Sequence, residues 1–152
     1  MIDELDKKIL NLISCDARIP FLEVARKCNV SGAAIHQRMQ KLQQLGIIKG
    51  SQYLFDPALV GNGTCAFIGL LLRDPSDSAR VLAELMNIPE IVECHLTTGN
   101  YDMFVKIYAH DNAHLLNIIH EKLQPIGIQR SETMVSFSEP IHRQMPIYLE
   151  HD

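Results

Sequence analysis

The stretch "IVECHLTTGNYDMFVKIYA" (residues 91–109) decides the fold of the second half of the chain. Apolar, β-favouring runs lie on both sides of Gly99 and Asn100. Gly-Asn between two such runs predicts a β-hairpin with a two-residue turn, because this turn needs positive φ angles. A hairpin alone leaves the polar side chains crowded at its tip unexplained, and these are Thr97, Thr98, Tyr101 and Asp102. The tip is therefore either a plain surface turn or a small-molecule site.

The segments around this hairpin complete an alternating order of strands and helices. The expected elements are a strand over 64–72, a helix over 76–86, strands over 91–98 and 101–109, a helix over 112–123 and a strand over 128–137. The order βαββαβ is that of the ferredoxin-like fold, also called the αβ-plait. We therefore expect a ferredoxin-like domain over residues 64–152, which includes the tail "SEPIHRQMPIYLEHD".

The first third of the chain has helical periodicity instead. Helices are expected over 3–15, 20–28 and 32–45, with the four-residue turn "CNVS" between the second and the third. Such a trio predicts a helix-turn-helix whose third helix is the recognition helix. A strand-like stretch, "IIKGSQYLF", follows it, and "DPALVGNG" (56–63) has the composition of a linker. The fold class is therefore α+β, with a helix-turn-helix domain over 1–55 joined by this linker to the ferredoxin-like domain.

Charge is distributed unevenly between the two parts. The whole chain has a formal net charge of −4, yet residues 16–49 hold six basic and two acidic side chains, and residues 24–55 hold no Asp or Glu. Residues 61–152 hold six basic and twelve acidic side chains. A basic segment on an acidic body predicts two modules with different partners, and the basic one suits double-stranded DNA.

The outward face of the third helix supplies the candidate DNA contacts. Small residues at its start would let it approach a groove closely, His36 and Gln37 can reach base edges, and the cations suit phosphates. Arg38 can also brace the fold while its head reaches a phosphate. The candidates are Ser31, Gly32, Ala33, His36, Gln37, Arg26, Lys27, Arg38, Lys41 and Lys49. The alternative is a three-helix packing or dimerisation element whose polar face is merely solvated.

Other classes of protein find less support. No apolar run approaches the roughly 20 residues of a membrane span, and the start "MIDELDKK" is unlike a signal peptide, so a cytoplasmic protein without a membrane partner is expected. His110, His114 and His120 are not expected to share a face, so no metal site is expected. No nucleophile elbow, P-loop or dinucleotide fingerprint is present. We therefore expect no enzyme activity and no cofactor.

Three motifs together resemble the Lrp/AsnC family of transcription regulators. They are D-x-x-I-L at Asp6–Leu10, S-x-x-x-[IV]-x-x-R-[IVM]-x-x-L-x-x-x-G-[IV]-I at Ser31–Ile48, and G-x-Y-D at Gly99–Asp102. The resemblance covers nearly the whole chain in the family's order. The words "FIG", "IHQR", "TTGNY" and "PIHR" are most similar to the family's asparagine-responsive branch.

The resemblance implies a winged helix-turn-helix joined to an αβ effector domain, dimers formed through the αβ domains, and rings of four dimers. It also implies a free amino acid as effector near the G-x-Y-D turn, with asparagine and a leucine-like amino acid both open. The effector contacts expected on this basis are Thr98, Gly99, Asn100, Tyr101, Asp102 and, on the last strand, Thr133. The competing function is a stand-alone amino-acid sensor or a small ferredoxin-like enzyme that binds no DNA.

Overall fold

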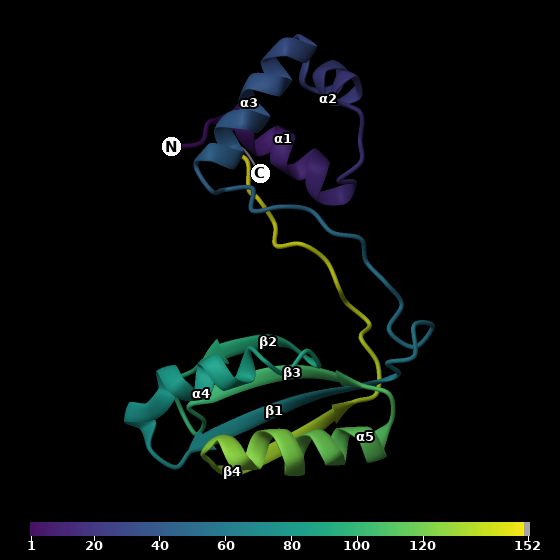
Figure 1. The fold of residues 1–152 in the computed structure, drawn as a ribbon. Helices are drawn as coiled ribbons and strands as arrows, with labels where there is room; N and C mark the ends of the chain where they lie inside the picture. The colour runs from purple at the N-terminus through teal and green to yellow at the C-terminus, as the bar shows by residue number, and fades with distance from the viewer. Residues whose placement is uncertain (151–152) are drawn as a thin grey trace. The chain divides into compact units, whose positions relative to one another are not determined.

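The computed structural model describes residues 1–150, and its contacts divide the chain into two compact units (Figure 1). Residues 1–53 and the C-terminal segment, residues 141–150, form the first unit. Leu54–Pro140 form the second unit. From the sequence, the C-terminal segment is expected in the second domain, over residues 64–152. The structure groups it with the first unit, because it packs along the first helix.

Three helices make up the body of the first unit: α1 (Glu4–Cys15), α2 (Phe21–Cys28) and α3 (Gly32–Gln44). Each begins or ends at a residue suited to that place. Asp3 caps α1 and forms a capping box with Asp6, Asn29 ends α2 with a φ of 54°, and the Ser31 hydroxyl accepts from the N–H of Ala34 at the start of α3. The apolar stripes meet in one core, formed by Ile9, Leu10, Ile19, Val24, Ala25, Ile35 and Leu42.

The strand expected after α3 is not formed. Residues 47–55 are bent or extended and pair with no other segment of the described chain. Gly46, with a φ of 70°, ends α3 as expected. An extended segment forms a strand only where a second extended segment pairs with its backbone groups. Residues 1–53 contain no such second segment.

The second unit is a four-stranded antiparallel sheet with helices on one face. Its strands are β1 (Thr64–Leu72), β2 (Ile91–Leu96), β3 (Met103–Ala109) and β4 (Ile128–Ser136), in the order β2-β3-β1-β4. The helices α4 (Ser78–Leu85) and α5 (Asn112–Asn117) cover the same face (Figure 1). Their apolar side chains share a core with the inward residues of the strands, including Ile68, Leu70, Val105, Ile107, Val81, Leu85 and Leu115. The expected βαββαβ order is confirmed.

Two details differ from the sequence prediction. The last helix continues beyond α5 as π-helical turns (η2, Ile118–Leu123) and a short 3-10 turn (η3, Gln124–Ile126), and a 3-10 turn (η1, Pro75–Asp77) precedes α4. The expected two-residue hairpin turn is wrong: β2 and β3 pair only as far as Leu96 and Met103, so residues 97–102 form a longer connection. Gly99 has a φ of 99°, whereas Asn100 does not adopt a positive φ. No helix within residues 1–150 has both the length and the apolar character needed to cross a bilayer.

Candidate DNA-binding face and effector site

The first turns of α3 present an exposed polar and small-residue face. Ser31, Ala33, His36 and Gln37 are exposed, and Gly32 is half-buried. The ring of His36 packs edge-on against Phe21 of α2, with centroids 4.6 Å apart, so its orientation is fixed by the fold. The structure therefore brings the expected base-reading side chains together at one end of α3.

Three of the expected phosphate-binding cations lie free on the surface or nearly so. Arg26, Lys27 and Lys49 are exposed. Lys27 forms a loose ion pair with Glu23, with Nζ 3.6 Å from Oε1. Among the described residues, Arg26 and Lys49 have no ion-pair partner, so their charge is available to DNA.

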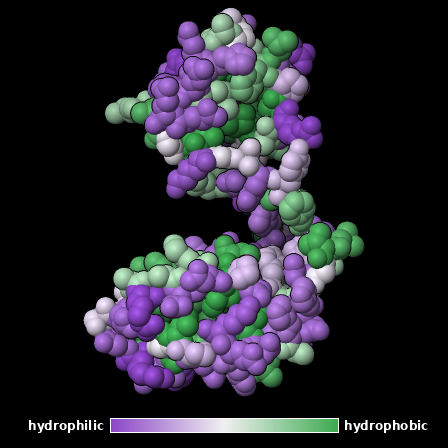
Figure 2. Space-filling model, in the orientation of Figure 1, coloured by the Kyte–Doolittle hydropathy of each residue, from purple (hydrophilic) through white to green (hydrophobic). Residues whose placement is uncertain are grey.

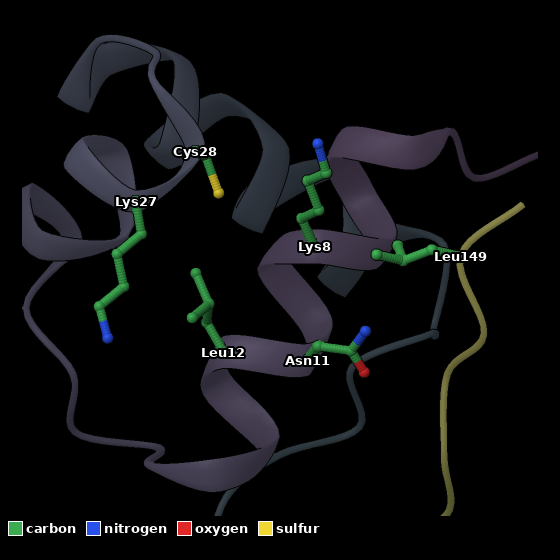
Figure 3. A pocket seen from close by; sticks show the side chains of 6 residues that line it. All are labelled: Lys8, Asn11, Leu12, Lys27, Cys28 and Leu149. Carbon is green, nitrogen blue, oxygen red and sulfur yellow. The ribbon is translucent and has the colours of Figure 1, made fainter. Parts of the chain in front are cut away.

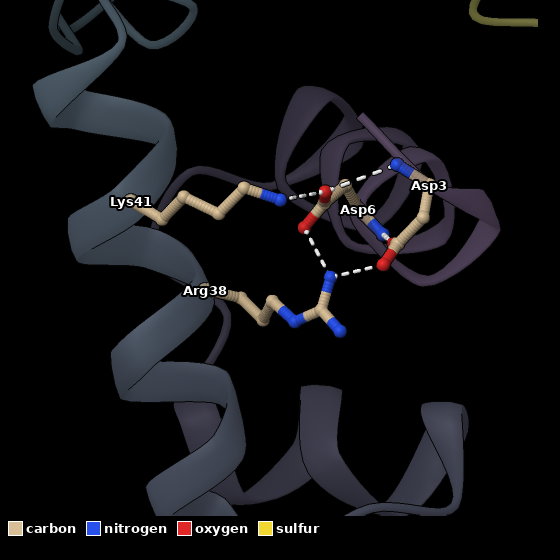
Figure 4. A network of polar contacts seen from close by, with 4 residues as sticks. All are labelled: Asp3, Asp6, Arg38 and Lys41. Carbon is tan, nitrogen blue, oxygen red and sulfur yellow. Dashed lines mark hydrogen bonds and ion pairs between the residues drawn. The ribbon is translucent and has the colours of Figure 1, made fainter. Parts of the chain in front are cut away.

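Arg38 and Lys41 are instead tied to a buried carboxylate (Figure 4). Asp6 on α1 is fully buried; its Oδ1 lies 3.1 Å from Arg38 Nη1 and its Oδ2 lies 2.7 Å from Lys41 Nζ. Arg38 also binds the carboxylate of Asp3. Lys41, which was expected on the outward face of α3, has a side chain that is 39% exposed, but Asp6 of α1 binds its ammonium group. The bracing role considered for Arg38 is the one the structure shows.

Asp3 and Asp6 are the residues that the sequence reasoning missed as partners of α3. Arg38 binds Asp3 and holds the pKa of its carboxyl at about 2, below the usual 3.8. Burial acts to raise the pKa of Asp6, but hydrogen bonds from Lys41, the Asp3 N–H and Arg38 outweigh it, and the net pKa is lowered. Both carboxylates are thus charged at neutral pH. The sequence shows only that two acidic residues, Asp3 and Asp6, and two basic residues, Arg38 and Lys41, lie about 35 positions apart; it does not show that they pair.

These lowered pKa values predict that acid weakens the first unit. A carboxyl whose pKa is lower in the folded than in the unfolded state stabilises the fold above its unfolded pKa, and this contribution is lost as pH falls through the folded pKa. For Asp3 the window runs from about pH 4 to about pH 2. Helical circular dichroism during urea unfolding at each pH measures the effect. An Asp3→Asn variant should show a flatter dependence in this window, and an unchanged slope would contradict the assignment.

In the second unit, Asp102 fastens the β2–β3 connection to β1. Its Oδ2 accepts from the N–H of Leu72 at 2.8 Å, and its own N–H donates to the carbonyl of Leu70 at 2.9 Å. On the other side of the connection, the hydroxyl of Thr97 donates to the carbonyl of Tyr101 at 3.0 Å. The tip is therefore a built turn in which one carboxylate oxygen of Asp102 is already engaged.

The ring of Tyr101 lies directly over Gly69 of β1, where any larger residue would collide with it. A Cβ at Gly69 would lie 2.6 Å from Cδ1 of the Tyr101 ring. The Tyr101 hydroxyl donates to the carboxylate of Glu132 on β4, and this hydrogen bond raises the pKa of the phenol. Tyr101 thus joins the tip to two further strands.

The other expected effector contacts fall into two groups. Thr98, Gly99 and Asn100 are exposed at the tip itself. Thr133 is paired with Ile68, a buried residue of the helix-covered face, whereas its neighbour Glu132 pairs with Gly69 under the Tyr101 ring. Because successive strand residues point to opposite faces, Thr133 and Tyr101 lie on opposite faces of the sheet. One copy of the chain does not bring Thr133 to the tip.

The sheet face opposite the helices carries aromatic side chains. Phe67 and Phe104 stack with centroids 6.0 Å apart, and Tyr101 lies beside Phe104 at 6.4 Å. Lys106, on the same face, has its Nζ 5.8 Å from the Phe67 ring and 3.3 Å from Oε2 of Glu139. This face combines aromatic area with a neutralised charge, as interfaces between protein chains do.

The histidines are arranged otherwise than expected. His110 and His114 do share a face, with stacked rings 4.5 Å apart, because α5 begins directly after β3 and its first turn folds back. The Nδ1 atom of His114 accepts from the N–H of His110, and Nδ1 of His110 lies 2.8 Å from the carbonyl of Gly61. Over residues 1–150, no three His, Cys, Asp or Glu side chains are grouped as metal ligands.

A three-helix unit with an exposed recognition helix and a separate βαββαβ unit define a regulator of the helix-turn-helix class. Residues 2–49 match the profile of a winged helix-turn-helix DNA-binding domain, and residues 65–146 match that of the Lrp/AsnC ligand binding domain. The chain belongs to the Lrp/AsnC family and is a transcriptional regulator with a DNA-binding and a ligand-binding domain. We therefore call the first unit the DNA-binding unit and the second the ligand-binding unit. The family, the fold class and the regulatory function expected from the sequence are confirmed.

Similar proteins of known name and structure agree with this assignment. The chain is 41% identical over 145 residues to the regulatory protein AsnC of Haemophilus influenzae, which covers 95% of this chain and 97% of that protein. The structure of Escherichia coli AsnC matches with a TM-score of 0.89 at 34% identity, covering 95% of this chain and 98% of the other. A transcriptional regulator from Neisseria meningitidis, solved as a complex with L-Met, shares the fold with a TM-score of 0.91 at 23% identity over 99% of both chains. These relatives are regulators rather than enzymes.

Proposed function

We propose that this regulator binds promoter DNA in the cytoplasm through the start of α3, as a dimer or a larger even multiple, and that a free amino acid at the Thr98–Asp102 tip changes its assembly or DNA affinity. The observation that carries the DNA part is the exposed face of α3 in a segment, residues 24–55, without any acidic residue. His36 and Gln37 are proposed to reach base edges, and Ser31, Gly32 and Ala33 to allow close approach to the groove.

Arg26, Lys27 and Lys49 are the proposed phosphate contacts, because their charges are exposed. Arg38 and Lys41 remain candidates only for a secondary contact, since Asp6 holds both heads. Their main role is proposed to be structural: by binding Asp6, they fix the position of α3 relative to α1.

Arg26→Ala is expected to weaken binding to all DNA sequences alike and to lower the salt slope of log affinity by about one unit. Gln37→Ala is instead expected to change which sequences are preferred, with the slope unchanged. Fluorescence anisotropy across a salt series measures both effects, with Arg73→Ala, an exposed cation of the second unit, as the matched control. If Arg26→Ala leaves the slope as in Arg73→Ala, α2 does not face the DNA backbone.

An amino-acid effector fits the chemistry around the tip. Exposed backbone groups at Thr98, Gly99 and Asn100 can meet a carboxylate, and a carboxylate such as Asp102 can accept from an ammonium group. Asp102 uses Oδ2 for Leu72, but a carboxylate has about four acceptor sites in total. Tyr101 would line the site beside it, and Thr133 would contribute only from another copy of the chain. Asparagine and a leucine-like amino acid are both proposed as candidates.

Asp102→Asn is expected to weaken effector binding about ten- to hundredfold, or roughly 1.5–3 kcal/mol, because it removes the charged acceptor while an amide oxygen can still accept from Leu72. Calorimetry with each of the twenty amino acids measures this. Asp111→Asn, another turn carboxylate in the same unit that caps α5, is the matched control. Equal affinity in the wild type and Asp102→Asn would place the effector elsewhere.

Self-association is proposed to cover two apolar surfaces of the ligand-binding unit. One is the aromatic sheet face described above. The other is the linker, where Leu54, Phe55, Leu59 and Val60 are all exposed; Figure 2 shows hydrophobic side chains gathered where Figure 1 draws this segment. Exposed apolar groups of this kind mark protein contacts. Light scattering tests this part, and a monomer at micromolar concentration would contradict it.

A further inference from the structure

The C-terminal segment, residues 141–150, lies along α1 of the DNA-binding unit although it follows the last strand of the ligand-binding unit. Ile147 is half-buried and packs against the core of the first unit. The side-chain amide of Asn11 on α1 donates to the carbonyl of Ile147 at 2.9 Å. Three other apolar side chains of the segment, Ile141, Met145 and Tyr148, are 69%, 77% and 72% exposed.

Charged groups hold the end of the segment to the same helix. The N–H of Glu150 donates to Oε2 of Glu4 at 3.2 Å. Lys7 lies between the two acids, with its Nζ 2.6 Å from Glu4 and 3.9 Å from Glu150. The segment thus has an apolar anchor, a side-chain-to-backbone hydrogen bond and an ion pair on one helix.

The groove that receives this segment is hollowed beside Leu149 (Figure 3). Leu149 points from the C-terminal segment towards α1, and the hollow of about 230 Å³ is lined by Lys8, Asn11, Leu12, Lys27, Cys28 and Leu149. Two lysines, Lys8 and Lys27, line this hollow, and Glu150 follows Leu149 directly in the chain. One acidic side chain of the segment therefore adjoins a hollow lined by two cations.

The segment begins directly beyond a strand that belongs to the candidate effector site. Glu132, which binds Tyr101, lies on β4; β4 ends at Ser136, and the chain enters the first unit at Ile141. The backbone therefore passes between the two units twice, after Tyr53 and after Pro140. The second passage starts four residues after β4, whereas the first reaches β1, which also contacts the tip, only through the linker.

We propose that residues 141–150 are a strap that docks on α1 and couples the ligand-binding unit to the DNA-binding unit of the same chain. The occupant of the α1 groove is this chain's own C-terminal segment, held at high effective concentration by its tether. The coupling part rests on the proposed function, because it needs an effector that changes DNA affinity. If the bound effector favours a different position of β4, it also changes the preferred position of the strap on α1. The effector site and the DNA-binding unit then share a coupling free energy.

Ile147→Ala tests the docking, with Ile141→Ala as the matched control in the same segment. Hydrogen exchange at the α1 amides of the full-length protein should become about tenfold faster in Ile147→Ala and stay unchanged in Ile141→Ala, because Ile147 packs against the core of the first unit whereas Ile141 is 69% exposed. Equal exchange in the two variants would overturn the strap.

The same two variants test the coupling. In Ile147→Ala, calorimetric affinity for the effector should stay within twofold of wild type, while the fold-change that the effector causes in DNA affinity should fall by half or more. An unchanged fold-change would overturn the coupling. If no amino acid changes the DNA affinity of the wild type, the proposed effector function fails, and the exchange experiment still decides the docking.

A crosslinking experiment decides whether the strap stays within its own chain. Unlabelled and ¹⁵N-labelled protein are unfolded together, refolded and treated with a carbodiimide, which joins Lys7 to Glu150 where their groups meet. Crosslinked peptides of a single isotope composition support the strap. Mixed peptides would overturn it in favour of a segment exchanged between two copies.

Discussion

Replacing both Arg38 and Lys41 with methionine is expected to destabilise the DNA-binding unit by about 3 kcal/mol. The change leaves the carboxylate of Asp6, which is 0% exposed, without its two cationic partners. An uncompensated buried charge costs about 3–5 kcal/mol, and the lower end applies because the Asp3 N–H still donates to Asp6. Urea unfolding followed by helical circular dichroism measures the loss.

The control for this prediction is Lys27→Met, which removes an exposed cation whose one ion pair within residues 1–150 is the loose one with Glu23. It should change the stability by no more than about 0.5 kcal/mol. Adding Asp6→Leu to the double variant should restore much of the lost stability, since no buried charge is left unpaired. No recovery in the triple variant would show that shape, rather than charge, makes these residues necessary.

Gly69→Ala is expected to destabilise the ligand-binding unit by about 1–3 kcal/mol, which is the usual range for overfilling a packed site. The new Cβ would lie 2.6–2.7 Å from three atoms of the Tyr101 ring, close to the ring's attachment, where the side chain has little freedom to move away. The displaced ring would also lose its hydrogen bond to Glu132. Thermal unfolding measures the loss, and effector calorimetry shows whether the tip is disturbed with it.

Gly63→Ala is the matched control, because a Cβ there would meet only Ala58 at an ordinary 4.0 Å. Removing the ring should relieve the clash, so Gly69→Ala should be harmless or nearly so in a Tyr101→Ala background. A Gly69→Ala penalty that is equal in both backgrounds would mean that the ring does not cause it.

Elements with strong local signals were predictable from the sequence. β1 runs over Thr64–Leu72, as expected, because nine residues of mostly apolar character lie between Gly63 and the polar turn that begins at Arg73. The helices of the first unit begin within a residue of the prediction, because Asp3 and Ser31 are good caps. The G-x-Y-D motif located the tip, although the connection there is longer than a two-residue turn.

Contacts between distant parts of the chain were not predictable in the same way. Asp102 binds Leu72, which is 30 residues away, and Asn11 binds Ile147 across 136 residues. Whether Lys41 faces DNA or Asp6 depends on how α1 crosses α3, which a helical stripe does not specify. The sequence thus identifies the candidate DNA-contacting residues, but it does not show that Asp6 binds two of them, Arg38 and Lys41.

The most direct test of the proposed function is the affinity of the wild-type protein for promoter DNA selected from genomic fragments, measured by fluorescence anisotropy with and without each of the twenty amino acids. We predict that this DNA is bound more tightly than a scrambled duplex at physiological salt, and that at least one amino acid changes the dissociation constant by about fivefold or more. Binding no tighter than to the scrambled duplex, or an affinity that no amino acid changes, would contradict it.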